Sequence, residues 1–240
     1  MAEVPDGADA RPWPRGIGAI TLFVEDLEAE RKAAIARKES YVYGGRCRRI
    51  DPAEAARRRE AGEPHTIRFR VPEGRTEWQD AVHDLVSFDN ADLEDFIILR
   101  SDGTPIYNMA VVSDDIDMRI THVIRGDDHI SNTPKQILLY QARGATVPVF
   151  AHVPMILGPD GKRLSKRHGA TAVGEYEDLG ILPQAMVNFL ALIGWSPREE
   201  RELFTIDELV ERFSLDGIVR KAGVFDPTKL EWLNGQHLSL

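Results

Sequence analysis

The sequence predicts an α/β fold with a parallel sheet, joined to an α+β region on one side and a helical region on the other. Two observations support this prediction. A strand-like run at 122–125, a helix that opens at Thr133-Pro134 and an apolar run at 147–157 follow one another at the spacing of a βαβ unit. After residue 170 the apolar spacing becomes that of helices. We therefore expect half of an α/β sheet flanked by two other regions.

The composition is that of a globular protein. Of the 240 residues, 42% are hydrophobic and 29% are charged. No apolar run reaches the length of about 18 residues that spans a bilayer, and no signal peptide is recognisable, so we expect a cytoplasmic protein without a membrane partner. The single cysteine, Cys47, excludes an internal disulfide and a multi-cysteine zinc site. The net charge of −9 argues against unselective coating of nucleic acid but permits local basic patches.

The region before residue 101 has the pattern of an α+β unit with antiparallel strands. Residues 1–24 combine proline, glycine and mixed charge without periodicity, which favours a loosely ordered leader. Asp51-Pro52 has the composition of a helix start, and His65–Val71 alternates as a half-buried strand does. The elements expected here are helices at 25–38 and 51–62, a strand at 65–71 and short apolar runs at 85–88 and 96–99.

The last third of the chain contains three helix starts. Pro183 opens a run that continues to Gly194, and Thr205 with Glu208 has the spacing of a capping box. Asp226-Pro227 is an N-cap followed by proline at the first helical position. We therefore expect a helical region after the sheet.

The most informative segment is the basic loop at 161–170. Its cations include Lys162, Arg163 and Lys166, with Ser165 among them, and it follows a strong turn signal and an apolar run. Lysine supplies a mobile positive charge, arginine a planar guanidinium with paired N–H donors, and serine a small hydroxyl donor. Together these groups can bind a phosphate. A solvated basic turn is the alternative interpretation.

The loops after the predicted strands are the other candidate sites, because ligands of open α/β sheets bind there. Arg125, at the end of its strand, could pair with a carboxylate, and the acids at 127–128 could grip a ribose or cap the next helix. Tyr107 follows a turn and could equally be a core aromatic residue. Asp114-Asp115 lacks further ligands at metal-binding spacing, so we expect no metal site.

Several segments in order resemble the signatures of glutamyl-tRNA synthetases, a family of class I aminoacyl-tRNA synthetases. Arg163-Leu-Ser-Lys-Arg167 is similar to the second signature loop of that class, the KMSKS type. The other similar segments lie at 43–48, 86–90, 95–108, 123–129, 190–195 and 224–235. The resemblance covers residues 25–240 and implies the second half of a Rossmann-type catalytic domain, with an α+β insertion and a helical stem-contact region.

The resemblance also implies roles for the residues of the basic loop and its approach. Lys166 would contact the ATP phosphates and stabilise the leaving pyrophosphate, while Arg163 and Ser165 would shape the loop as further catalytic residues. Met155 and Ile156 would lie alongside the adenine of ATP and contact it. ATP would be a substrate accompanied by Mg²⁺, and no zinc is expected.

Two further groups of residues receive a role from the resemblance. Tyr107 and Arg125 would line the pocket for L-glutamate, with Arg125 paired to a carboxylate. The implied tRNA(Glu) contacts are Arg46, Arg48 and Arg49. In this family glutamate and ATP form glutamyl-adenylate, and the acyl group then moves to the terminal adenosine of the tRNA.

The implied domains are an atypical leader at 1–24, an α+β insertion for the tRNA acceptor end at 25–100, the second half of the catalytic domain with the KMSKS-type loop at 101–170, and the helical stem-contact region at 171–240. The first signature of the class, His-x-Gly-His, has no counterpart, since residues 1–24 contain no histidine. The anticodon-binding domain is also absent. We therefore expect a partial chain of a glutamate–tRNA ligase that is inactive alone, because both signature loops act around one α-phosphate.

The alternative to an inactive ligase fragment is a non-catalytic tRNA-binding paralogue. A relative that glutamylates a modified tRNA base fits less well, because such relatives usually lose the Lys-Leu-Ser-Lys type of loop. Full-length members of the family are usually monomeric. A parallel sheet without its first strands leaves an unpaired apolar edge, so we expect this chain to self-associate.

Overall fold

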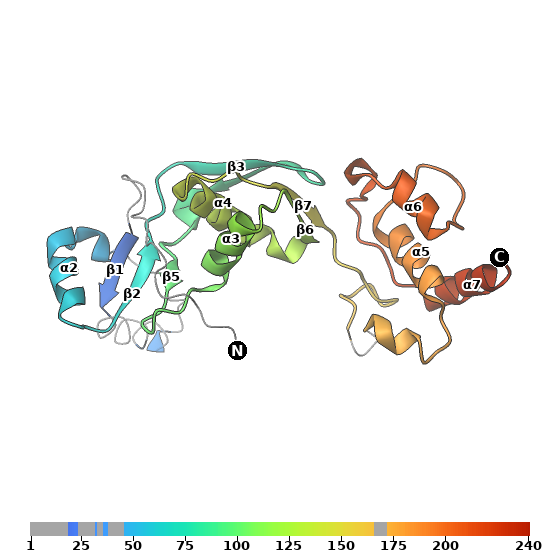
Figure 1. The fold of residues 1–240 in the computed structure, drawn as a ribbon, viewed down its shortest axis with the longest axis horizontal. Helices are drawn as coiled ribbons and strands as arrows, with labels where there is room; N and C mark the ends of the chain where they lie inside the picture. Colours follow the sequence, from blue (N-terminus) through green and yellow to red (C-terminus); the bar gives the residue numbers. More distant parts are fainter. Residues whose placement is uncertain (1–18, 24–31, 33–35, 38–45, 166–171) are drawn as a thin grey trace. The chain divides into compact units, whose positions relative to one another are not determined.

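The computed structural model describes residues 19–23, 32, 36–37, 46–165 and 172–240. The chain divides into two compact units, whose elements are labelled in Figure 1. The first unit comprises residues 1–77, 87–120 and 132–147, and the second comprises residues 78–86, 121–131 and 148–240. Most of the expected leader, almost all of the helix expected at 25–38, and Lys166 lie outside the described residues.

An antiparallel three-stranded sheet organises the first unit. Its strands are β1 (Ala19–Phe23), β2 (His65–Phe69) and β5 (Ile97–Leu99), in the order β1-β2-β5. β1 lies within residues that we expected to form a loosely ordered leader. Its five residues are mostly apolar, but they are too few to stand out from the surrounding prolines and glycines, and their strand conformation depends on full pairing with β2.

Three α-helices of the first unit lie within the continuously described residues 46–165. Helix α2 (Pro52–Glu60) begins as predicted, because the side chain of Asp51 accepts a hydrogen bond from the backbone nitrogen of Ala53 at 2.9 Å. The other two are α3 (Tyr107–Asp117) and α4 (Thr133–Ala142). The hydroxyl of Tyr140 in α4 donates to Asp115 in α3 at 2.6 Å, so a polar contact joins these two helices.

The second sheet contains the parallel strands that the βαβ spacing predicted. Its strands are β3 (Arg75–Asp80), β4 (Asp84–Asp89), β6 (His122–Gly126) and β7 (Val149–Val153), in the order β4-β3-β7-β6. β6 runs parallel to β7 along its whole length, and β3 is parallel to β7. The prediction of an α/β fold with a parallel sheet is confirmed.

Strand β3 was not expected, because its inward positions carry unusual residues. Thr76, Trp78 and Asp80 are buried and alternate with exposed residues. Two of these three side chains are polar, so an apolar alternation is not visible in the sequence. β3 and β4 both lie in the stretch that we assigned to the insertion, yet they belong to the same sheet as β6 and β7.

Helices dominate the second unit after residue 180, as predicted. They are α5 (Pro183–Gly194), α6 (Ile206–Arg212) and α7 (Pro227–Leu238). Helices α5 and α7 pack side by side (Figure 1) over a buried apolar cluster that includes Phe189, Phe225 and Leu233. The rings of Phe189 and Phe225 meet edge to face at 5.0 Å.

Short 3₁₀ helices connect several of these elements. They lie at Arg46–Arg49, Asn90–Asp92, Asp127–Asn132, Val173–Tyr176 and Leu215–Gly217. In the part of the chain that the structure describes, no helix has both the length and the apolar character needed to cross a membrane.

Candidate active site

The carboxyl ends of β6 and β7 lie next to each other in the second unit. In their parallel register Arg125 is opposite His152, and Gly126 is opposite Val153. Beyond these ends, a 3₁₀ helix continues from β6 and an extended segment continues from β7. Ligands of open α/β sheets bind beyond the carboxyl ends of strands, so these two segments border the candidate site.

Gly126 allows the two segments to approach closely. A Cβ atom placed on Gly126 would lie 2.6 Å from Oδ1 of Asp128 and 3.2 Å from the sulfur of Met155. The first of these distances is shorter than the contacts that real Cβ atoms make. The structure therefore places Met155, the expected adenine contact, against the end of the strand that carries Arg125.

Two neighbouring side chains hold the guanidinium of Arg125. Its Nε atom donates a hydrogen bond to Nε2 of His152 at 3.2 Å, and its Cζ atom lies 5.4 Å from the centre of the Phe150 ring. His152 has no exposed surface, and its Nδ1 atom lies 2.5 Å from Oδ2 of the buried Asp80. Arg125 is thus the outer member of a series of contacts that begins inside the sheet.

Both carboxylate oxygens of Asp80 accept hydrogen bonds. Its Oδ1 atom accepts hydrogen bonds from the backbone nitrogens of Val82, His83 and His152 at 3.0, 3.1 and 3.2 Å. Its Oδ2 atom also accepts from the indole of Trp78 at 3.3 Å. Burial raises the pKa of Asp80, but the hydrogen bonds of His152, Val82 and His83 outweigh burial and lower the pKa below its usual value. The group is therefore charged at neutral pH.

His152 is held in its neutral form. Burial lowers its pKa below the usual value of 6.5, and this effect outweighs the hydrogen bond and charge of Asp80, which raise the pKa. The hydrogen-bond network assigns the single ring proton to Nδ1, which donates to Asp80. Nε2 is then an acceptor, which is the role that the N–H of Arg125 requires.

The basic segment predicted at 161–170 begins as a tight hairpin. Leu157 and Arg163 pair as an isolated antiparallel bridge. Within the turn the backbone nitrogen of Gly158 donates to the carbonyl of Lys162 at 2.7 Å. A short turn with two adjacent exposed cations, Lys162 and Arg163, is the geometry expected of a phosphate-holding loop, and also of a solvated basic turn.

Arg163 connects the hairpin to the segment after β6. Its Nη2 atom lies 3.4 Å from Oδ2 of Asp128. Ser165 is exposed, whereas Lys166 lies outside the described residues. Among the residues expected to contact substrates, Arg125, Met155 and Arg163 therefore all contact the chain segment at 125–128 or belong to it.

The base of the hairpin is bound to the helical region. The backbone nitrogen of Leu157 donates to the carbonyl of Gly223 at 2.9 Å, and that of Phe225 donates to the carbonyl of Leu157 at 2.8 Å. A Cβ atom on Gly223 would lie only 2.3 Å from the carbonyl oxygen of Ile193, so this position requires glycine. Ile156, the second expected adenine contact, packs against the buried cluster around Phe225.

Tyr107, the other residue expected in the glutamate pocket, belongs to the first unit. It is the first residue of α3, and half of its surface is exposed. The adjacent Asn108 is buried and accepts a hydrogen bond from Gln136 at 3.2 Å. Arg125 belongs to the second unit.

The expected tRNA contacts lie in the first unit. Arg48 forms a two-pronged pair with the buried Asp95, with N–O distances of 2.6 and 2.5 Å, and it also donates to the carbonyl of Val71 at 3.1 Å. Arg49, the next residue of the same 3₁₀ helix, is exposed. Arg46 begins this helix.

Asp80 and His152 are the site residues that sequence reasoning missed. His152 stands alone in the sequence, where a lone histidine is more often structural than catalytic, and Asp80 belongs to no recognisable motif. A weak signal exists, because Asp80 occupies the same face of β3 as the buried Thr76 and Trp78. A charged residue on the inward face of a strand requires a buried partner.

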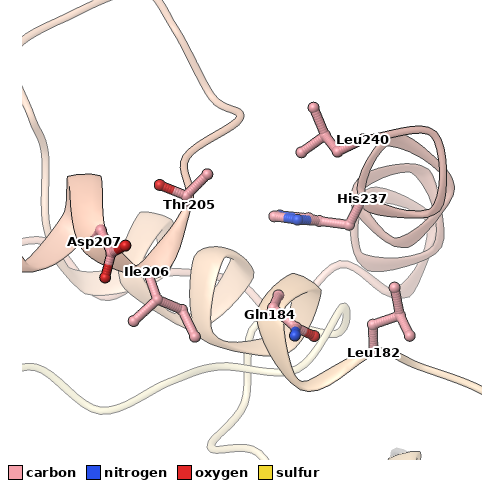
Figure 2. A pocket seen from close by; sticks show the side chains of 7 residues that line it. All are labelled: Leu182, Gln184, Thr205, Ile206, Asp207, His237 and Leu240. Carbon is pink, nitrogen blue, oxygen red and sulfur yellow. The ribbon is translucent and has the colours of Figure 1, made fainter.

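The second unit also contains a pocket of about 370 Å³ between its helices. Figure 2 shows His237 on one side of it and Thr205, Ile206 and Asp207 on the other. No arginine or lysine lines this pocket, and none of the substrate contacts expected from the sequence does so. It is therefore separate from the candidate site at the ends of β6 and β7.

Residues 21–232 match the sequence model of one family, described as "tRNA synthetases class I (E and Q), catalytic domain". Among curated relatives, glutamate–tRNA ligase 2 of Koribacter versatilis is 55% identical over 216 residues, which are 89% of this chain and 45% of that protein. Glutamate–tRNA ligase of Carboxydothermus hydrogenoformans is 51% identical over 215 residues, again 89% of this chain and 45% of the relative.

Solved structures agree with these sequence matches. The crystal structure of glutamate-tRNA synthetase from Elizabethkingia anophelis superposes with a TM-score of 0.82 at 32% identity, over 92% of this chain and 50% of that one. A glutamate–tRNA ligase from Elizabethkingia meningosepticum, solved in complex with its amino acid, gives the same values. The chain thus spans about half the length of the relatives that it matches.

Proposed function

Because the chain belongs to the family of class I tRNA synthetases for glutamate and glutamine, we propose that it takes part in the attachment of glutamate to tRNA. The family that the ordered motifs predicted is confirmed, and the relatives that are 55% and 51% identical over the aligned residues are named glutamate–tRNA ligases. The proposed compartment is the cytoplasm, and the proposed substrates are L-glutamate, ATP and tRNA(Glu).

The observation that supports this function most directly is the meeting of Arg125, Met155 and Arg163 around the carboxyl end of β6. In the proposal Arg125 pairs with a carboxylate of glutamate, since a guanidinium matches that group with two parallel hydrogen bonds. The hydroxyl of Tyr107 supplies a second glutamate contact. Met155 and Ile156 lie alongside the adenine of ATP and contact it.

The basic hairpin is proposed to handle the phosphates. ATP enters with Mg²⁺, which neutralises part of its charge. An oxygen of the glutamate carboxylate attacks the α-phosphorus, the bond to the bridging oxygen breaks, and pyrophosphate leaves. Lys166 stabilises the charge on this leaving group, and Arg163 and Ser165 shape the loop around it. A hydroxyl of the terminal adenosine of tRNA then attacks the acyl carbon, and AMP leaves.

The arginines at 46, 48 and 49 are proposed to contact the tRNA backbone, which positions RNA without reading its sequence. The side chain of Arg49 is exposed and can therefore reach a phosphate. Arg48 has a dual role in this proposal, since its pair with Asp95 also holds the 3₁₀ helix on the unit.

Binding measurements on this chain test the proposal. We expect L-glutamate and ATP to shift distinct sets of NMR signals, Arg125→Gln to abolish the response to glutamate alone, and Lys166→Ala to weaken the response to ATP alone. Val210→Ala, at an exposed position of α6, is the control for both titrations. No response to either ligand would contradict the proposal.

Two assays with tRNA separate catalysis from binding. ATP–pyrophosphate exchange with glutamate and tRNA identifies a chain that forms the adenylate. A gel shift with tRNA in the absence of exchange is expected both of a ligase fragment that is inactive alone and of the tRNA-binding paralogue, and the glutamate and ATP titrations separate these two. Failure of both would contradict a role in tRNA charging.

A further inference from the structure

We propose that His152 is a positioning residue for carboxylate recognition by Arg125, and that Asp80 holds His152 in the ring orientation in which it acts. This inference rests on the proposed function, in which Arg125 binds glutamate. Neither Asp80 nor His152 has a place in the substrate contacts that the resemblance implied. The proposal rests on a continuous series of contacts: Nδ1 of His152 lies 2.5 Å from Oδ2 of Asp80, and Nε2 of His152 lies 3.2 Å from Nε of Arg125.

The contact with His152 decides which side of the guanidinium can meet a ligand. The Nε–H of Arg125 is engaged by Nε2 of His152, so a carboxylate can form two parallel hydrogen bonds only with the two Nη nitrogens. The Phe150 ring, with its centre 5.4 Å from Cζ, opposes movement of the guanidinium away from this position. A preset arginine loses less conformational freedom when the ligand binds.

Asp80 determines that His152 accepts a hydrogen bond from Arg125. The carboxylate receives the proton of Nδ1, which leaves Nε2 with its lone pair facing Arg125. If Nε2 carried the proton, two N–H groups would face each other and the contact would be lost. The titratable and charged groups that act on the His152 ring are Asp80, Arg125 and His83. Arg125 and His83 both disfavour a second proton on the ring, whereas Asp80 favours it.

A pair of substitutions separates the two contacts of His152. In His152→Asn the short amide keeps a donor for Asp80 near the place of Nδ1 but has no acceptor near the place of Nε2. In His152→Gln the longer side chain brings its amide oxygen close to the place of Nε2, where it can accept from Arg125. The matched control is His122→Asn, at the exposed histidine that begins β6.

The readouts are NMR titrations of this chain with L-glutamate and with ATP, and the ¹⁵N signals of the His152 ring. We expect Nδ1 to be protonated and Nε2 to be unprotonated. His152→Asn should weaken glutamate binding about tenfold or more, the effect of losing one hydrogen bond to a charged group. His152→Gln should retain affinity within about threefold, a fraction of that effect. ATP binding should change little in both variants, and both should remain folded at the temperature of the titrations.

Three results would overturn the inference. Unchanged glutamate affinity in His152→Asn, while Arg125→Gln abolishes binding, contradicts the positioning role and leaves the proposed function intact. Equal loss of glutamate and ATP binding in a His152→Asn variant that remains folded would show that His152 supports the site in general and does not act through Arg125. If the unsubstituted chain does not bind glutamate although the His152 ring shows the predicted protonation, then glutamate is not the ligand of Arg125. The positioning of Arg125 for that ligand is then contradicted as well.

Discussion

Two buried carboxylates, those of Asp80 and Asp95, are each held by several partners at once. Asp80 accepts hydrogen bonds from three backbone nitrogens and two side chains, so its charge is compensated although it lies inside the sheet. Asp95 has the same character in the first unit, where it accepts from Arg48 and from the backbone nitrogen of Val71 at 2.8 Å. Each of these carboxylates joins chain segments that are far apart in sequence.

The buried pair of Asp80 and His152 makes the fold sensitive to acid. Below the usual histidine pKa of 6.5 the unfolded chain takes up a proton at His152, whereas the folded chain takes it up only at a lower pH. The stability contributed by the neutral ring is therefore fully present above pH 6.5. It is lost as the pH falls from 6.5 to the lower pKa that His152 has in the folded chain. The lowered pKa of Asp80 acts in the same direction below 3.8.

We expect the urea midpoint of unfolding to decrease between pH 7.5 and pH 5.5, and to decrease less in His152→Gln than in the unsubstituted chain. His122→Gln, which removes an exposed imidazole from β6, should retain the full decrease. Equal decreases in the unsubstituted chain and in His152→Gln would show that His152 is not the titrating group.

A second prediction at this scale concerns two glycines. Gly223→Ala should destabilise the chain by about 1–3 kcal/mol, because the new Cβ would lie 2.3 Å from a backbone carbonyl that cannot rotate away. Gly235→Ala is the matched control inside α7, where the new methyl group meets open space. It should stabilise the chain by about 0.5–1 kcal/mol, since alanine favours helices. Urea denaturation of both variants measures the difference, and equal effects would contradict the close packing at Gly223.

At the scale of elements, helix starts were the most predictable feature. The side chain of Asp226 accepts from the backbone nitrogen of Thr228 at 2.9 Å, as its place before Pro227 indicated. Thr205 and Glu208 form the predicted capping box of α6. Such caps involve residues within three positions of each other, so they can be recognised without knowledge of the tertiary fold.

The capping box provides a prediction for α6. Thr205→Ala should destabilise the second unit by about 1 kcal/mol, because it removes the acceptor for the backbone nitrogen of Glu208. Thr228→Ala, an exposed threonine of α7, should change stability by less than about 0.5 kcal/mol. Chemical denaturation followed by circular dichroism measures both. A cost no larger than that of the control would mean that the cap contributes nothing.

The carboxylate of the same box responds only to strong acid. The hydrogen bond of Arg201, followed by that of the Thr205 backbone, lowers the pKa of Glu208 to about 2. The stability that this group contributes is therefore present above its usual value of 4.5 and is lost as the pH falls towards 2. The acid response between pH 5.5 and 7.5 belongs to His152 and not to Glu208.

At the scale of the whole molecule, the order of the sheet leaves β6 at one end. Among the described strands β6 pairs only with β7, and Ile124 of β6 is half exposed. An apolar edge strand is a template for pairing with a second chain.

We therefore expect concentration-dependent self-association, measured by light scattering, and a reduction of it in Ile124→Lys, because a charged side chain disfavours edge pairing. Val210→Lys, which places the same charge on the exposed surface of α6, should leave association unchanged. A monodisperse monomer at every concentration would contradict this prediction.

The sequence alone predicts the family, the parallel sheet and most helices, because these follow from local patterns and from motifs whose order along the chain can be read directly. It also identified Arg125, Met155 and Arg163 as candidates. It did not reveal β3, because the inward residues of that strand are largely polar and mimic a surface segment.

The partners of the functional residues follow from the tertiary fold and cannot be predicted from the sequence pattern. Asp80 and His152 are 72 positions apart, and Arg48 and Asp95 are 47 positions apart. No periodicity connects residues at such distances, because their contact depends on which strands become neighbours and on the register between them. The charge of a buried carboxylate is stabilised by whatever the fold brings within hydrogen-bonding distance, and that is a property of the assembled sheet.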